Sequence, residues 1–220
     1  MGAVRAAKLV IFDCDGVLVD SERLIQEVDM AMIGRLGWPI TRDEIFAEHL
    51  GRSEAAIIAN IERRVGRPVP ADFISAKAAA YDSILRSRLV AVAGVSEAIT
   101  LLRSGGARLC VASSSGHARI RLSLDLTGLR TFFADDQIFS AEDVAHGKPA
   151  PDLFLLAASR MSTSAQRCVV AEDSPAGVAA AKAAGMRVVG YCGLTPAGLL
   201  GDADLLVSQM TDLPAAIAAL

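Results

Sequence analysis

Two aspartates lie two positions apart near the amino terminus, in the tetrapeptide Asp13-Cys14-Asp15-Gly16. They directly follow Leu9 to Phe12, an apolar run with the length and composition of a buried strand. Because side chains alternate along a strand, we expect both carboxylates on one side and Cys14 on the other, in the core. Gly16 permits the sharp turn that follows. The pattern therefore predicts two acids at the carboxyl end of a strand, where open α/β sheets bind ligands.

Three more polar segments follow apolar runs or precede predicted helices. Ser113-Ser114-Ser115 follows a second strand and offers hydroxyl and N–H groups to an anion. Lys148 lies in Gly147-Lys148-Pro149-Ala150-Pro151, and Glu172-Asp173-Ser174-Pro175 follows another strand. Taken singly, these segments are also typical of a serine N-cap, a solvated lysine and an acidic helix start. In combination they place acids, hydroxyls and one cation at successive strand ends.

The balance of charge at these strand ends favours a bound metal. Asp13, Asp15, Glu172 and Asp173 are all acidic, and Lys148 alone opposes them. A divalent cation relieves the repulsion among carboxylates that converge on one point. These residues by themselves therefore predict a cation site.

Strands alternating with helices position these segments. Apolar runs predict strands at Leu9–Phe12, Leu109–Ala112, Cys168–Ala171, Arg187–Tyr191 and, at an edge, Leu205–Val207. Helical patterns cover Val95–Arg103, Ala118–Leu126, Pro151–Met161 and Pro175–Ala184. This alternation indicates right-handed βαβ units and a Rossmann-like parallel sheet, an α/β fold.

Residues 18–89 differ, because they contain no convincing strand and predict successive helices. Thr41 and Glu44 have the spacing of a capping box, and Gly37 and Gly66 mark helix ends. We therefore expect a catalytic α/β core from residues 1–17 and 90–220 with an inserted α-helical cap at 18–89.

The four polar segments follow the motif order of the haloacid dehalogenase-like hydrolases, a superfamily that the whole chain resembles. Asp13 to Glu22 resembles its first motif, Ser113 its second, Lys148 its third and Glu172-Asp173 its fourth. Lys148 to Asp152 and Glu172 to Ser174 are particularly similar to the branch that contains β-phosphoglucomutase and sugar-phosphate phosphatases. The helical insertion is similar in position to the small α-helical cap of that branch.

The resemblance implies a phosphatase of small phosphorylated metabolites. Asp13 would attack phosphorus and form a mixed anhydride. Asp15 would protonate the leaving oxygen and then take a proton from the attacking water. Ser113 and Ser114, with nearby N–H groups, would hold the phosphoryl oxygens, and Lys148 would offset their charge.

The resemblance also implies the metal and its ligands. Mg²⁺ would take oxygens from the Asp13 side chain, the Asp15 carbonyl and Asp173, with Glu172 in or beside that shell. Matched to the family, Arg52, Ser53 and Glu54 fall in the substrate-specificity loop of the cap. Lys77 falls where the mutase-like branch has a lysine that faces the site.

Three other functions compete with phosphate-ester hydrolysis. A phosphomutase needs cap cations to hold a second phosphate, but the arginine and histidine of β-phosphoglucomutase match Glu54 and Ile25, so hydrolysis is favoured. Lys77 matches the mutase pattern, and Arg52 would replace the missing arginine if the loop shifts by two residues, so the mutase stays an alternative. A phospho-receiver domain is disfavoured by the first-strand nucleophile and the insertion, and a haloacid dehalogenase proper by the acid Asp15.

Composition excludes several other classes. The chain has 220 residues, 52% hydrophobic and 21% charged, with a formal net charge of −3. Such a mildly acidic chain without a basic stripe gives no electrostatic reason to bind nucleic acid or a membrane surface. It also has no export signal and no apolar run long enough to span a bilayer. We expect a cytoplasmic protein with reduced cysteines, and a monomer by default.

Overall fold

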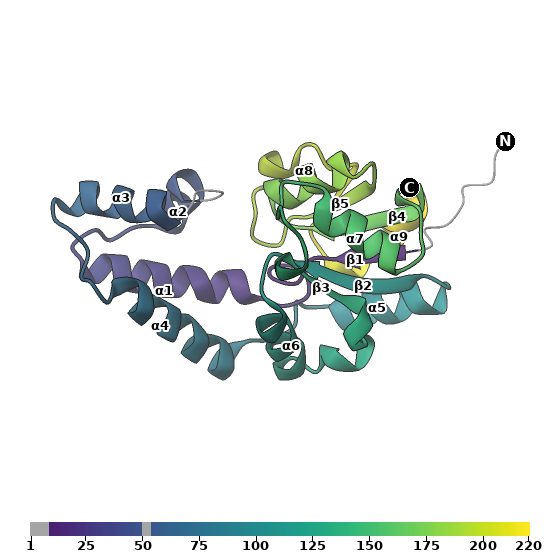
Figure 1. The fold of residues 1–220 in the computed structure, drawn as a ribbon, viewed down its shortest axis with the longest axis horizontal. Coiled ribbons are helices and arrows are strands. Elements are labelled where there is room, and N and C mark those ends of the chain that lie inside the picture. Colours follow the sequence, from purple (N-terminus) through teal and green to yellow (C-terminus); the bar gives the residue numbers. More distant parts are fainter. Residues whose placement is uncertain (1–8, 50–53) are drawn as a thin grey trace. The chain divides into compact units, whose positions relative to one another are not determined.

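The computed structural model describes residues 9–49 and 54–220. The chain divides into two compact units (Figure 1). One unit is Ser21–Leu89, and the other joins the segment that ends at Asp20 to Val90–Leu220. The larger unit is called the core unit here, and Ser21–Leu89 is called the helical unit.

A parallel sheet of six strands, in the order β3-β2-β1-β4-β5-β6, organises the described part of the core unit. The strands are β1 (Leu9–Phe12), β2 (Arg108–Ser113), β3 (Ile138–Ser140), β4 (Cys168–Glu172), β5 (Arg187–Tyr191) and β6 (Leu205–Val207). Phe12 pairs in register with Val111 of β2 and Ala171 of β4. The carboxyl ends of these three strands therefore meet at one edge of the sheet. The predicted α/β fold with a parallel sheet is confirmed, whereas the short strand β3 was not predicted.

Helices cover both faces of this sheet. They are α5 (Val95–Ser104), α6 (His117–Leu126), α7 (Asp152–Arg160), α8 (Pro175–Ala183) and α9 (Leu213–Ala219). Leu9 and Ile11 pack in one core cluster with Leu153 and Phe154 of α7 and Val178 of α8. Short 3₁₀ helices lie at Leu129–Phe132, Asp135–Gln137, Ala141–Asp143, Ala165–Arg167, Ala197–Leu200 and Met210–Asp212.

Alternation along β1 points Val10 and Phe12 to the other face of the sheet, and both are fully buried there. Phe12 packs edge-on against Phe133, with ring centroids 6.4 Å apart. Burial on both faces explains why the central strands are continuously apolar rather than alternating. Cys14 is also buried, as the alternation predicted.

The helical unit consists of α1 (Ser21–Arg35), α2 (Arg42–Glu48), α3 (Glu54–Val65) and α4 (Phe73–Arg88). The predicted capping box opens α2: the Thr41 side chain accepts the Glu44 N–H at 3.3 Å, and Glu44 accepts the Thr41 N–H at 2.8 Å. A small core holds the helices together and includes Ile33, Trp38, Ile40, Ile45, Ile61 and Phe73.

No helix in the described ranges combines the length and apolarity required to cross a membrane.

Candidate active site

Asp13 directly follows β1, at the sheet edge where the strand ends meet. Its N–H donates to the carbonyl of Ala171 at 3.0 Å, which continues the β1–β4 pairing and fixes its backbone. Its side chain is buried and accepts a hydrogen bond from Nζ of Lys148 at 2.6 Å. Lys148 comes from the loop before α7, so the contact joins segments 135 residues apart.

The ammonium of Lys148 is held by three oxygens. Besides Asp13, it donates to the carbonyl of Ala112 at 3.1 Å and to Oε1 of Glu172 at 2.7 Å. The side chain is 4% exposed, and its Nζ lies 4.9 Å from the centre of the Phe154 ring. Lys148 is therefore a buried cation between carboxylates from the ends of β1 and β4, not a solvated surface lysine.

Glu172 holds Lys148 and the start of α8 together. While Oε1 contacts Lys148, Oε2 accepts the N–H of Ser174 at 2.7 Å and its hydroxyl at 2.9 Å. A Cβ on Gly177 would lie 1.7 Å from Oε1, so only glycine leaves room for this carboxylate. The sequence placed Glu172 in or beside the metal shell, and in the structure Lys148 contacts one of its oxygens and Ser174 the other.

Asp173 packs against the turn that follows Asp15. Gly16 has a φ of +81°, and a Cβ at that position would lie 2.0 Å from Oδ2 of Asp173. The Asp173 carboxylate thus lies against the backbone of Gly16, the residue after Asp15. Burial raises the pKa of the Tyr191 phenol at the end of β5, and the negative charges of Asp20 and Asp173 add to this effect.

Asp15 contacts the segment that connects β2 to α6. The hydroxyl of Ser115 donates to its Oδ2 at 2.7 Å, and Nη2 of Arg119 lies 3.4 Å from its Oδ1. Neither residue was predicted to be a site residue. Ser115 belongs to the serine run that was recognised, but Arg119 lies in the first turn of α6, where an arginine usually indicates a solvated face.

The two serines predicted to bind phosphate differ in their surroundings. Ser113 is buried at the end of β2, and its Oγ accepts the N–H of Ser115 at 3.1 Å. This bond leaves the Ser113 O–H as a donor. Ser114 is exposed at the same strand end.

Burial and charge shift the pKa values of the central groups. Burial raises the pKa of Asp13 to about 7, and the neighbouring Glu172 adds to the rise against the opposing effect of Lys148. For Lys148, burial acts to lower the pKa, but Asp13 and Glu172 outweigh it and hold the pKa above its ordinary value. The two carboxyl groups thus share one ammonium, that of Lys148.

The oxygen donors here suit a hard cation. In the described ranges, no three His, Cys, Asp or Glu side chains are grouped so as to hold a metal ion. The Asp173 carboxylate lies against the turn at Gly16, and Asp13 and Asp15 precede this turn at the end of β1. Mg²⁺ commonly uses one or two protein carboxylates and keeps several waters. The residues present therefore fit Mg²⁺ with few protein ligands.

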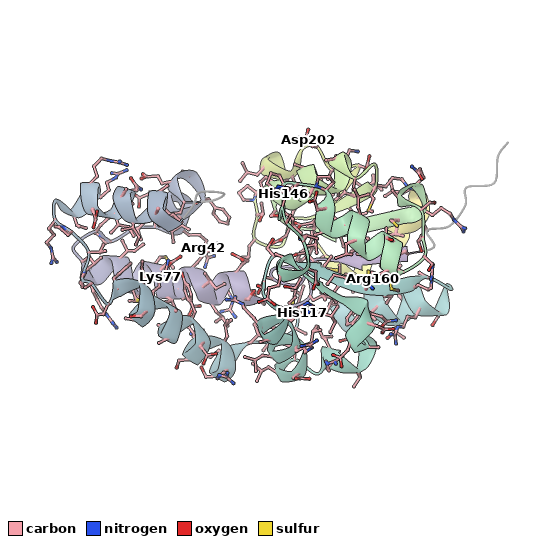
Figure 2. The ribbon with its side chains drawn as sticks, viewed as in Figure 1. Arg42, Lys77, His117, His146, Arg160 and Asp202 are labelled. Carbon is pink, nitrogen blue, oxygen red and sulfur yellow. The ribbon has the colours of Figure 1, made fainter. Side chains whose placement is uncertain are left out.

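The cap residues predicted to contact substrate are described only in part. Arg52 and Ser53 lie outside the described residues, and Glu54 begins α3. Lys77 lies on α4 (Figure 2), and its Nζ is 3.2 Å from Oδ1 of Asp29 on α1. The Tyr81 hydroxyl also donates to Asp29. Lys77 is therefore paired within the helical unit.

The chain matches the family model for haloacid dehalogenase-like hydrolases over residues 10–191. It belongs to this family, which confirms the resemblance found in the sequence. The strand order also excludes the receiver interpretation, because receiver domains have the order 2-1-3-4-5.

Several curated relatives of the chain are named phosphatases. It is 30% identical to validoxylamine A 7'-phosphate phosphatase of Streptomyces hygroscopicus subsp. limoneus, over 94% of this chain and 95% of that protein. It is 29% identical to hexitol phosphatase B of Escherichia coli K12, over 98% of each. The chain is also 32% identical, over 88% of its length, to the Arabidopsis thaliana protein SUPPRESSOR OF QUENCHING 1, chloroplastic. It spans only 19% of that longer protein. The chain is a phosphatase of the haloacid dehalogenase-like family.

Solved structures share the whole fold. A haloacid dehalogenase-like protein of unknown function from Agrobacterium tumefaciens is 36% identical, with a TM-score of 0.89 over 96% of this chain and 98% of that one. A family hydrolase from Deinococcus radiodurans, solved with bound phosphate and sodium, is 29% identical, with a TM-score of 0.85 over 98% and 97%. A β-phosphoglucomutase-like protein from Thermotoga maritima is 27% identical, with a TM-score of 0.78 over 97% and 99%.

Proposed function

We propose that this phosphatase hydrolyses a small phosphorylated metabolite, such as a sugar phosphate, in a Mg²⁺-dependent reaction through an aspartyl-phosphate on Asp13. The observation that carries the proposal is the buried ammonium of Lys148, placed 2.6 Å from Asp13 and 2.7 Å from Glu172. A cation fixed beside a strand-end carboxylate is suited to stabilising charge during phosphoryl transfer.

Asp13 is the nucleophile in this proposal. A carboxylate oxygen forms a bond to phosphorus while the ester P–O bond breaks. Lys148 orients the Asp13 carboxylate through its hydrogen bond to Oδ1. Its positive charge also offsets the negative charge of the phosphoryl oxygens. Glu172 fixes Lys148 and is assigned to positioning rather than to metal binding.

Asp15 carries protons in both half-reactions. Its carboxyl group gives a proton to the leaving oxygen as the ester bond breaks. As a carboxylate it then accepts a proton from the water that attacks phosphorus, and the bond from phosphorus to Asp13 breaks. Asp13 and the protonated Asp15 are thereby restored, and phosphate is released.

Phosphate binding is assigned to the end of β2. The Ser113 hydroxyl and the N–H groups beside Ser114 are the donors for phosphoryl oxygens. The Asp13 and Asp173 carboxylates and the Asp15 carbonyl are assigned to Mg²⁺. When bound, the ion neutralises phosphoryl charge and orients the phosphate.

The helical unit is assigned as a cap that selects the substrate. The Lys77–Asp29 pair favours hydrolysis over mutase activity, because the charge of Lys77 is already compensated within the unit. A mutase has to hold a second phosphate with cap cations. Arg52, Ser53 and Glu54 stay candidates for contacts to the non-phosphate part of the substrate.

A phosphate-release screen tests the proposal. Purified protein is incubated with sugar phosphates, sugar-alcohol phosphates, phosphoglycolate and nucleotides, with Mg²⁺ or with EDTA. We expect release from at least one small phosphomonoester with Mg²⁺ only, and its loss in Asp13→Asn. Asp136→Asn is the matched control, because this exposed residue lies before the amino end of β3, away from the carboxyl ends of the strands that form the site. Activity in EDTA, or Asp13→Asn activity within about tenfold of wild type, contradicts the mechanism.

The mutase alternative is decided by product analysis. The protein and Mg²⁺ are incubated with β-glucose 1-phosphate and catalytic β-glucose 1,6-bisphosphate, and glucose 6-phosphate is measured against free phosphate. Hydrolysis predicts phosphate without isomerisation. Isomerisation that outruns phosphate release by orders of magnitude would establish the mutase instead.

A further inference from the structure

We infer that Ser115 and Arg119 are positioning residues that hold the Asp15 carboxyl group in place for proton transfer. The inference rests on the proposed function, because it assigns supports to the proposed acid and base of that reaction. The Ser115 hydroxyl donates to Oδ2 at 2.7 Å, and Nη2 of Arg119 lies 3.4 Å from Oδ1. Each oxygen of Asp15 thus has a donor from the β2–α6 segment.

The backbone beneath Ser115 is fixed independently of its side chain. The Ser115 N–H donates to Oγ of Ser113 at 3.1 Å, and its carbonyl accepts the buried hydroxyl of Ser140 at 2.8 Å. Ser140 ends β3, the strand next to β2. The Ser115 hydroxyl is therefore carried on a rigid strand end, and removing it should leave these two bonds intact.

The start of α6 is anchored by the turn after β3. His117, the first residue of α6 (Figure 2), donates its N–H to Oε2 of Glu142 at 3.1 Å. Its Nε2 lies 2.9 Å from Oδ1 of Asp143. Two carboxylates thus occupy the helix start and fix the turn from which Arg119 reaches Asp15.

Arg119 has the contacts of a positioning residue rather than of a structural ion pair. Its Nε is buried, and no acceptor lies opposite it among the described residues. Nε and Nη2 lie on the same edge of the guanidinium, so the edge that contacts Asp15 keeps a second donor. The guanidinium therefore presents two donors on the edge that faces the Asp15 carboxyl group.

Leaving-group dependence separates proton transfer from a general loss of structure. 4-Nitrophenolate leaves without protonation, whereas an alkoxide needs a proton as the ester bond breaks. The parameter kcat/KM covers the steps up to departure of the leaving group, so it isolates the acid step. A displaced Asp15 therefore lowers kcat/KM for an alkyl phosphate more than for 4-nitrophenyl phosphate.

The test compares Arg119→Ala, Arg119→Lys and Ser115→Ala on both substrates with Mg²⁺, with thermal melts to verify folding. We expect Arg119→Ala and Ser115→Ala to lose about tenfold more kcat/KM on the alkyl phosphate than on 4-nitrophenyl phosphate. Arg119→Lys, which keeps the charge, should lie between Arg119→Ala and wild type. Arg121→Ala is the matched control on the same helix, where it pairs with Asp135 at 3.1 Å, and should stay within about twofold on both substrates.

Two results overturn the inference and differ from each other. If wild type is active but Arg119→Ala and Ser115→Ala lose the same factor on both substrates, or lose nothing, the positioning role is wrong and the proposed phosphatase mechanism stands. If wild type releases phosphate from neither substrate nor from any compound of the wider screen, the proposed function fails, and the inference fails with it. If Arg119→Ala does not fold, Ser115→Ala alone decides the matter, because its backbone contacts do not involve the removed hydroxyl.

Discussion

Lys148 and Asp13 form a buried ion pair of 2.6 Å in which the lysine side chain is 4% exposed. The same ammonium contacts Glu172, so removing it would leave two carboxylates buried with no opposing charge. An uncompensated buried charge is far more costly than the net value of the pair itself. The pair therefore links the stability of the core unit to the proposed chemistry.

Lys148→Met tests that link, because it removes the charge and keeps most of the volume. We expect kcat to fall by about a hundredfold or more. The free energy of unfolding should fall by about 3 kcal/mol, measured by denaturant titration. Lys182→Met is the control: Lys182 pairs with Asp204 at 2.6 Å on the surface and should cost less than about 1 kcal/mol. A Lys148→Met protein with nearly normal kcat would remove Lys148 from the mechanism.

Gly16→Ala tests the proposed metal site without replacing any of its carboxylates. The added Cβ would collide with Oδ2 of Asp173, so we expect the Mg²⁺-induced rise in melting temperature to be lost. Gly106→Ala is the matched control, because its φ of +83° carries similar backbone strain while nothing lies within 4 Å of its Cβ. Equal Mg²⁺ responses in the two variants would show that Asp173 does not bind the ion.

The sequence predicted the parts of the fold that are set locally. β1, β2, β4 and β5 are apolar runs bounded by turn residues, and the pattern marks such runs clearly. β3 has only three residues, Ile138–Ser140, and follows a polar 3₁₀ turn, so no periodicity marks it. Its place at the sheet edge depends on pairing with β2, which is a tertiary property.

The candidate site divides in a similar way. Asp13, Lys148 and Glu172 could be predicted as site residues from the sequence, because acids and a lysine follow the predicted strands in a fixed order along the chain. The partners of Asp15 could not, since the contact from Arg119 joins residues 104 positions apart. The pairing of Lys77 with Asp29 was missed for the same reason: it depends on how α4 packs on α1.

Asp204 gives a prediction of pH dependence outside the site. Burial acts to raise its pKa, but hydrogen bonds from Lys182 and from the Val188 N–H, at 2.6 and 2.7 Å, hold the pKa below the ordinary 3.8. Stability from this depressed pKa is present above pH 3.8 and is lost as pH falls through the lower folded value. Asp204→Asn should therefore cost about 1 kcal/mol at pH 7 and progressively less below pH 3.8.

Chemical denaturation across this pH range measures the effect. Asp202→Asn is the control, because this exposed residue (Figure 2) lies in the same loop. A stability deficit in Asp204→Asn that does not change with pH would show that the carboxylate charge is not what stabilises the loop.

Asp15→Asn should slow both half-reactions, because one carboxyl group serves as the acid and then as the base. With 4-nitrophenyl phosphate the first half-reaction needs no proton, so the variant should show a burst of nitrophenol followed by slow turnover. Rapid-mixing absorbance measures the burst. Turnover at the wild-type rate would mean that another residue transfers the proton.

The most direct measurement of the central claim is to trap the aspartyl-phosphate. Asp15→Asn protein is mixed with 4-nitrophenyl phosphate and Mg²⁺, quenched in acid and reduced with borohydride, which converts an acyl-phosphate to homoserine. Peptide mass spectrometry then locates the change. The mechanism predicts homoserine at position 13, with none in a sample that received no substrate. Modification at another residue, or an unmodified Asp13 during an observed burst, would contradict it.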